Sequence, residues 1–340
     1  MNWDLLRPRS NARVTMHDVA RLAGVSQQTV SRVLNGGTSV SPETAMRVMR
    51  AKDALGYRRN AAARALVTSR SMRLGVVGFG VTQFGPASTL FGIVEAARLR
   101  NYSTNLVSLK DLDLKSLRSA VDVLADDDVE GIIVLAPVSG AAALAEVLAD
   151  RLPMVRFEPG LDNGTTSISV DEVEGARLAT RHLIELGHTS IWQVAGPHGW
   201  LGTDARIAGW RQELAAHALA APEPLHGDWS SASGYRIGQR LLEKNATAIF
   251  AANDQMALGV LKAFHDNGVS VPRDASIVGF DDIPEAAFFQ PALTTVKLDF
   301  SEVGHRCVAR LLEIIDGQVL QAEQAITPEL NIRATTAPAK

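Results

Sequence analysis

The sequence has very little cysteine and no long uninterrupted hydrophobic run. Its one cysteine, Cys307, excludes an intramolecular disulfide. The longest apolar stretch, residues 131–145, is broken by Pro137 and Gly140 and is too short to cross a bilayer, so no membrane partner is expected. The first residues, MNWDLLRPRSNAR, lack the apolar core of a secretory signal. We therefore expect a cytoplasmic protein.

Motifs of common enzymes and cofactor sites are lacking as well. No phosphate-binding loop, HExxH, GxSxG or CxxC pattern occurs. A partial dinucleotide fingerprint begins at Gly78 and Gly80, but Gln83 stands where its third glycine belongs. We therefore expect no catalytic residues, no metal and no cofactor.

Charge is distributed very unevenly along the 340 residues. Residues 1–73 contain 13 Lys and Arg against 4 Asp and Glu, a balance of +9, whereas the remainder has a balance of −12. A chain of this length is expected to form two or three packed units. Clustered positive charge on one unit favours DNA or RNA as its partner, although a basic solvated surface would give the same count.

Two short helices joined by a tight turn are predicted near the N-terminus. Thr15 and Asp18 have the spacing of a capping box, and apolar residues follow at helical spacing. Gly24 allows the left-handed backbone of a turn, and Ser26 caps a second helix. This pattern is typical of a helix-turn-helix, although a plain surface helix with polar residues remains the alternative.

The second helix of such a motif would enter the major groove of DNA. Gln27, Gln28 and Arg32 would face base edges, because Gln pairs well with adenine and Arg with guanine. Shorter polar side chains would hold phosphates. The candidate DNA-contacting residues of this region are Thr15, Ser26, Gln27, Gln28, Thr29, Ser31, Arg32, Asn35 and Tyr57.

A third helix and a linker complete the N-terminal region. Ser41, Pro42 and Glu43 form a strong helix start, and Gly56 forms its end. We therefore predict an all-α DNA-binding domain over residues 14–59. The alanine-rich run within residues 60–71 is helix-prone but has little apolar surface to bury, so it is predicted to fold as a hinge only when supported.

Residues 72–336 alternate between short apolar strands and amphipathic helices, which favours parallel, doubly wound α/β sheets. The region is large for one sheet, and the alternation is interrupted near residues 157–168, which together favour two lobes. Strands are predicted over residues 74–79, 105–109, 131–136, 154–157, 191–195, 248–252, 276–280 and 294–298. Helices are predicted over residues 89–100, 172–186, 206–218, 234–243, 255–267 and 302–315.

Polar residues follow several of these strands. Glu158, Asn253 and Asp281 each come directly after an apolar strand, with Arg206 near a helix start and Trp229 in a loop. Ligands of such folds bind at the carboxyl ends of strands. Carboxylates, amides, an arginine and an aromatic face suit a polyol. Acids after strands are also common helix caps, which is the structural alternative.

Several segments resemble the lactose-repressor family. They are VTMHDVARLAGVSQQTVSRVLNG, GYRRNAAARAL, HLIELGHTSIWQVAGP, ARIAGW, GDWS, AANDQMALGV, SIVGFDD and PALTTVKLDF, and they span nearly the whole chain. The resemblance implies a helix-turn-helix domain joined to a two-lobed, periplasmic-binding-protein-like sugar-binding domain. It also implies a nucleoid-associated homodimer on an inverted-repeat operator, with Leu66 wedged into the minor groove beside Asn60 and Ala63.

The same resemblance implies a ligand set. Its members are Phe79, Pro86, Glu158, Arg206, Trp229, Asn253, Asp281, Leu298 and Phe300. Leu298 replaces a glutamine and Glu158 a shorter aspartate of the lactose-binding pattern, so the expected effector is a glycoside of open identity, most simply an inducer. A co-repressor mode with a non-sugar effector, and a periplasmic-type sugar-binding protein, are the alternatives.

Overall fold

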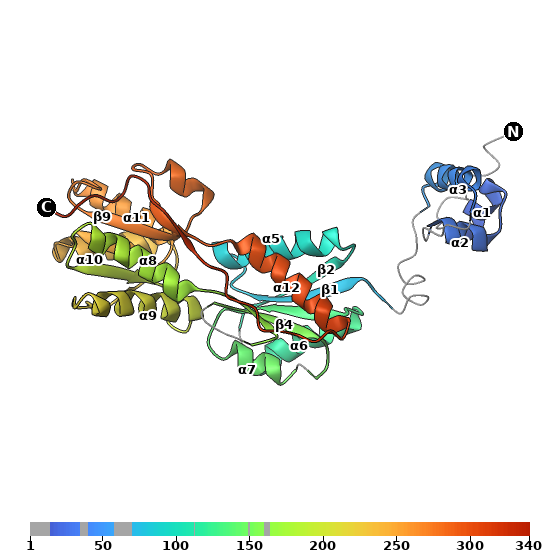
Figure 1. Ribbon diagram of the computed structural model, residues 1–340, viewed down its shortest axis with the longest axis horizontal. Helices are drawn as coiled ribbons and strands as arrows, with labels where there is room; N and C mark the ends of the chain where they lie inside the picture. Colours follow the sequence, from blue (N-terminus) through green and yellow to red (C-terminus); the bar gives the residue numbers. More distant parts are fainter. Residues whose placement is uncertain (1–13, 35–39, 58–69, 112, 149, 160–163) are drawn as a thin grey trace. The chain divides into compact units, whose positions relative to one another are not determined.

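A computed structural model describes residues 14–34, 40–57, 70–111, 113–148, 150–159 and 164–340. The chain divides into two compact units, Met1–Ser71 and Met72–Lys340, which we call the head and the body (Figure 1). No helix among the described residues combines the length and the apolar character needed to cross a membrane.

The head contains the three predicted helices, α1 (Met16–Ala23), α2 (Gln27–Leu34) and α3 (Pro42–Leu55). Thr15 and Asp18 form the capping box of α1, and Gly24 ends that helix in a left-handed conformation with φ 64°. The Ser26 Oγ accepts a hydrogen bond from the Thr29 backbone N–H, as expected for a cap of α2. The predicted caps of the head are therefore confirmed.

The head core is small and made of aliphatic side chains from all three helices. Val19, Val30 and Val48 are fully buried, and Ala20 lets α1 and α2 approach closely. Tyr57, after the end of α3, is also buried in this core with 7% of its surface exposed.

The first lobe of the body is built on a five-stranded sheet in the order β2-β1-β3-β4-β5, and every neighbouring pair is parallel. Its strands are β1 (Arg73–Phe79), β2 (Ser103–Leu109), β3 (Gly131–Leu135), β4 (Met154–Pro159) and β5 (Ser167–Val170). Its helices are α5 (Phe84–Leu99), α6 (Leu114–Asp126), α7 (Ala141–Glu146) and α12 (Phe300–Ile315).

The second lobe is built on a six-stranded sheet in the order β11-β10-β9-β8-β6-β7. All neighbours are parallel except β11, an antiparallel edge strand beside β10. Its strands are β6 (Ile191–Ala195), β7 (Leu225–His226), β8 (Ala248–Ala251), β9 (Ser276–Asp281), β10 (Thr294–Lys297) and β11 (Glu329–Asn331). Its helices are α8 (Glu172–Glu185), α9 (Leu201–Ala216), α10 (Ser231–Glu243), α11 (Asp254–Asp266) and the 3-10 helix η2 (Pro284–Phe288).

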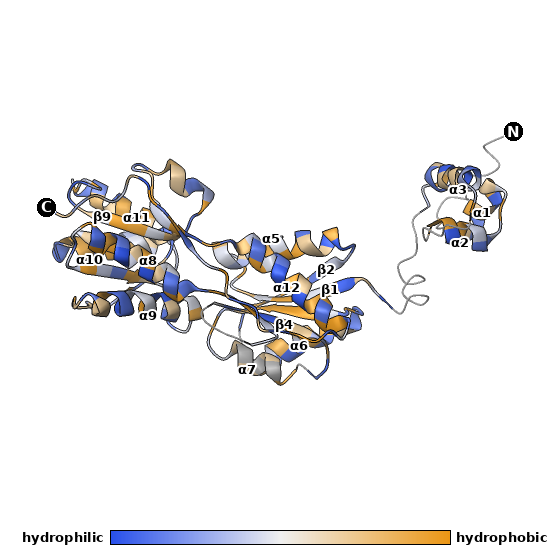
Figure 2. Ribbon diagram, viewed as in Figure 1, coloured by the Kyte–Doolittle hydropathy of each residue, from blue (hydrophilic) through white to orange (hydrophobic). Residues whose placement is uncertain are grey.

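Both sheets are hydrophobic along their strands, whereas hydrophilic residues occupy outward helix faces (Figure 2). Every residue of β3, β5, β8 and β9 is buried, as expected for parallel strands covered on both faces. Helices α5 and α12 pack closely because they meet at Gly92 and Gly304. A Cβ at Gly304 would lie 2.5 Å from the backbone carbon of Gly92.

The two predicted lobes correspond to the two sheets, but the interruption near residues 157–168 does not separate them. Strands β4 and β5, on either side of this interruption, pair with each other in the first sheet. Residues 160–163 lie outside the described part of the chain, and the chain enters the second lobe only after Val170. It returns through α12, which packs on α5 and β4, and then re-enters the second sheet at β11.

Candidate functional site

The exposed face of α2 carries most of the predicted DNA-reading residues. Gln27, Gln28 and Arg32 are exposed, and the Gln27 amide lies 3.0 Å from Nδ1 of His17 on α1. Ser26 and Thr15 are occupied as helix caps. The aromatic ring of Tyr57 belongs to the head core. Thr29 and Ser31 lie on α2 and are partly exposed, whereas four other residues proposed for DNA contact, Asn35, Asn60, Ala63 and Leu66, lie outside the described part of the chain.

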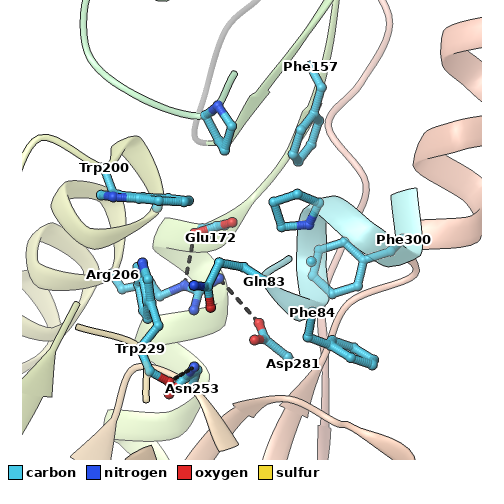
Figure 3. A pocket seen from close by; sticks show the side chains of 14 residues that line it. Gln83, Phe84, Phe157, Glu172, Trp200, Arg206, Trp229, Asn253, Asp281 and Phe300 are labelled. Atoms are coloured by element: carbon cyan, nitrogen blue, oxygen red, sulfur yellow. Dashed lines mark hydrogen bonds and ion pairs between the residues drawn. The ribbon is translucent and has the colours of Figure 1, made fainter. Parts of the chain in front are cut away.

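A cavity of about 500 Å³, partly open to solvent, lies between the two lobes of the body. Its walls come from the carboxyl ends of strands and from the first turns of the helices that follow, the expected position for a ligand in parallel α/β sheets. The lining residues are Gln83, Phe84, Gly85, Pro86, Pro137, Phe157, Glu172, Trp200, Gly202, Arg206, Trp229, Asn253, Asp281 and Phe300 (Figure 3).

Arg206 is the centre of the polar wall. Its Nε donates a 2.9 Å hydrogen bond to Oε2 of Glu172, and its Nη2 lies 3.3 Å from Oδ1 of Asp281 (Figure 3). Its Nη1 donates to the backbone carbonyl of Ala252. The guanidinium carbon also stacks 3.9 Å above the ring centroid of Phe280. Contacts with α8, with β9 and with the residue that follows β8 therefore fix the arginine in position.

Asn253 and Asp254 connect the cavity to the second sheet. Asn253 caps α11 and donates from its amide to the Trp229 carbonyl at 3.0 Å, which holds the loop that carries the indole. Asp254, fully buried behind the cavity, accepts hydrogen bonds from the hydroxyl of Thr295 and the backbone N–H of Ile283. Asp254 therefore connects the start of α11 to β10 and to the segment that follows β9.

Two lining residues are held in a left-handed backbone conformation. Trp229 has φ 70° and Asp281 has φ 99°. Such conformations cost about 1–3 kcal/mol each for a residue other than glycine, and they concentrate at functional sites. The left-handed backbone places the Trp229 indole and the Asp281 carboxyl at positions that an extended backbone would not give them.

Burial controls the ionisation of the polar wall. It raises the pKa of Asp281 to about 8, although the neighbouring Arg206 opposes this rise, and it raises the pKa of Asp254 to about 7. Burial also opposes the charge of Arg206, but the carboxylates of Glu172 and Asp281 outweigh it and raise the arginine's pKa.

The raised pKa values of these two carboxyls predict the direction in which the free energy of unfolding changes with pH. Because their pKa values in the folded protein lie above the ordinary value of about 4, folding binds their protons more tightly. Their contribution is complete below about pH 4 and is lost as pH rises through 7 to 8. The free energy of unfolding in urea should fall across this window, and fall less in Asp281→Asn. An equal fall in both proteins would contradict this assignment.

The opposite wall, from the first lobe, is almost entirely apolar. Phe84 and Phe300 meet edge to face with ring centroids 5.9 Å apart, and Pro86, Pro137 and Phe157 extend this surface. From the second lobe, Trp200 closes one side and packs edge to face against Trp229, with centroids 5.8 Å apart. Of the first-lobe lining residues, Gln83 alone has a polar side chain.

Six of the nine predicted ligand residues lie in this lining, namely Pro86, Arg206, Trp229, Asn253, Asp281 and Phe300. The structure does not bring the other three into it. Glu158 pairs with Arg156 at 2.8 Å and lines a separate small hollow. Leu298 is buried in the core, and Phe79 lies behind Trp200, with ring centroids 6.1 Å apart.

Sequence reasoning missed Glu172, Trp200 and Phe157. Side chains alternate along a strand, so Phe157 faces the cavity where its neighbour Glu158 does not. Glu172 follows the helix cap Asp171, and such an acid is ordinarily solvated. Trp200 precedes α9, a position with no local signal for a ligand contact.

Comparisons with known proteins agree with both units. Residues 15–60 match the family of bacterial regulatory proteins described as lacI, and residues 180–336 match a periplasmic binding protein-like domain. The lactose operon repressor of Escherichia coli K12 is 33% identical over 326 residues, which cover 95% of this chain and 91% of that protein.

Solved structures give the same result. A lac repressor dimer bound to operator and the anti-inducer ONPF has a TM-score of 0.86 at 33% identity, covering 96% of this chain and 100% of that chain. A complex of the transcriptional regulator CelR with cellobiose has a TM-score of 0.70 at 28% identity, covering 95% and 100%. The predicted fold class and the prediction of a transcription regulator rather than an enzyme are confirmed. The chain belongs to the lacI family of bacterial regulatory proteins.

Proposed function

We propose that this protein represses transcription in the cytoplasm, at the nucleoid, and that a sugar or glycoside in the body cavity releases it from an inverted-repeat operator. The single observation that carries the ligand class is the pairing of two unlike walls. A hydrogen-bonding wall around Arg206 faces an aromatic wall around Phe300, which suits the hydroxyls and the apolar face of a sugar. The cellobiose complex of a similar regulator supports this class.

Each predicted domain has a separate role in this proposal. Residues 14–59 would hold DNA, residues 60–71 would order on it, and residues 72–336 would sense the effector and pair two subunits. A sugar that binds one lobe arrangement more tightly than another shifts the equilibrium toward it, with a coupling free energy of about 1–3 kcal/mol.

Calorimetry with a panel of hexoses and their methyl glycosides tests the ligand class. At least one neutral sugar should bind the full-length protein, and Trp229→Ala should abolish that binding, because the ring loses its stacking surface. Tyr235→Ala, on α10 and outside the cavity lining, is the matched control. A panel in which no sugar binds would contradict the proposed ligand class.

Arg32→Ala is expected to relax base preference at one operator position and to weaken operator binding by about 1–3 kcal/mol. Its exposed position on α2 leaves the guanidinium free to reach a base edge. Selection from a randomised palindromic library, followed by sequencing, measures the preference. Arg50→Ala, on the exposed face of α3, removes the same charge and should leave the selected sequence unchanged. Loss of preference in both variants would refute base reading by Arg32.

Exposed apolar residues on both lobes support a homodimer. Phe91 on α5 and Phe288 on η2 expose 77% and 84% of their surface, and Leu99 on α5 and Leu106 on β2, in the same lobe as Phe91, are also exposed. Large exposed aromatic residues are typical of subunit interfaces.

Replacing Phe91 and Phe288 with Glu is expected to convert the dimer to a monomer, because each dimer would bury four carboxylates against apolar surface. Light scattering after gel filtration measures the mass. Val319→Glu, at a position that is 95% exposed and lies on neither α5 nor η2, should remain dimeric. A dimeric double variant would place the interface elsewhere.

A further inference from the structure

All charged groups that line the cavity come from the second lobe. They are the guanidinium of Arg206 and the carboxyls of Glu172 and Asp281, so two acids face one base. Because each acid contacts the arginine directly, the single cation is already paired inside the protein. Even when Asp281 is protonated, Glu172 alone balances Arg206.

Glu172 occupies an unusual position for the first residue of a helix. It begins α8, yet only 2% of its surface is exposed. Its side chain reaches the first turn of α9, where a Cβ on Gly202 would lie 2.6 Å from Oε2. A helix N-terminus attracts anions through its free N–H groups and its dipole. The protein's own carboxylate therefore takes the place beside α9 and Arg206 that an anionic ligand group would need.

The remaining donors of Arg206 are limited. Nε points to Glu172, and one N–H of each terminal nitrogen points to Ala252 or Asp281. Of the five N–H groups of a guanidinium, two are left. Two single donors can bind hydroxyl oxygens, but a phosphate or carboxylate brought to them would also face the carboxylate of Glu172 beside Nε. Like charges placed together in a partly desolvated site cost several kcal/mol.

We infer that Glu172 is a specificity-determining residue that restricts the effector to uncharged or cationic polyols, such as neutral glycosides and amino sugars, and rejects phosphorylated or carboxylated sugars. The sugar class in this inference rests on the proposed function, whereas the rejection of negatively charged ligands does not. The aromatic side chains that complete the cavity are compatible with both accepted classes, because their faces attract C–H groups and cations alike.

The experiment uses the full-length protein and two sets of probes in isothermal titration calorimetry. The first set pairs glucose and galactose with their 6-phosphates and their 2-amino-2-deoxy forms. Each neutral or amino sugar that binds should do so at least about tenfold more tightly than its phosphate. A 6-phosphate that binds as tightly as its neutral partner would overturn the inference.

The second probe, inorganic phosphate alone, does not depend on the identity of the sugar. Wild type should bind it no better than Arg206→Ala does, whereas Glu172→Gln should bind it at least about tenfold more tightly than wild type. Glu174→Gln, on the same helix but paired outside the cavity with Arg177, should behave like wild type.

The outcomes separate the two proposals. If no sugar binds but Glu172→Gln gains phosphate, the sugar function fails and the charge selection stands. If wild type binds phosphate through Arg206, or if Glu172→Gln gains nothing, the selection by Glu172 is overturned whatever the sugars do. Circular dichroism of Glu172→Gln confirms that the variant is folded, because Gln keeps an acceptor for Nε of Arg206.

Discussion

Arg206→Ala is expected to lower the free energy of unfolding by about 3–5 kcal/mol and to abolish sugar binding. The guanidinium is buried with 6% of its surface exposed, and it contacts Glu172, Asp281 and the Ala252 carbonyl. Its removal leaves the buried carboxyls of Glu172 and Asp281 without their shared partner, and an uncompensated buried polar group costs free energy. Urea denaturation of the full-length dimer measures the loss.

Arg211→Ala on the same helix is the matched control. Arg211 is 52% exposed and lies 3.9 Å from the Glu223 carboxylate, an exposed pair whose contribution should be below about 1 kcal/mol. If both variants lost the same stability, the guanidinium of Arg206 would not be the organising group of the cavity.

Asp281→Asn is expected to retain operator binding while its sugar affinity falls by about 10- to 100-fold. Hydrogen bonds that involve a charged group contribute about 1.5–3 kcal/mol, and the carboxyl both faces the cavity and orients Arg206. The amide has nearly the same shape, so the loss reports on hydrogen bonding rather than packing. Calorimetry gives the affinity, and a gel-shift assay gives operator binding.

Asp266→Asn provides the comparison for this prediction. Asp266 ends α11 in an exposed ion pair with Lys262, outside the cavity lining. It should leave both sugar and DNA binding unchanged. A full sugar response in Asp281→Asn would remove Asp281 from the binding site.

The three helices of the head and most strands of the body could be predicted because their signals are local. Thr15, Gly24 and Ser41 act within one helix turn of their own positions, and capping depends on little else. Buried parallel strands are also recognisable in the sequence as short apolar runs. Asn253 and Asp281 follow two of these runs, so they could be predicted at the cavity without any knowledge of the sheet order.

The rest depended on contacts between distant segments. The burial of Glu172 requires the first turn of α9 and the glycine at position 202, thirty residues further along the chain. The interruption near residues 157–168 does not mark the change of lobe, because turn-forming residues signal a loop without saying which strands pair across it. Glu158 rather than Phe157 was likewise predicted as a ligand contact, because the sequence does not show which face of β4 borders the cavity.

The most direct test of the central claim is operator binding measured with and without the sugar that calorimetry selects. A palindromic DNA site obtained by selection should bind the dimer tightly, and saturating sugar should weaken that binding by about 5- to 150-fold, the range of a 1–3 kcal/mol coupling. Asp281→Asn should bind the same DNA and respond far less. Tighter DNA binding in the presence of sugar would reveal a co-repressor instead of an inducer. Failure to select any DNA sequence would contradict the account of the protein as an operator-binding repressor.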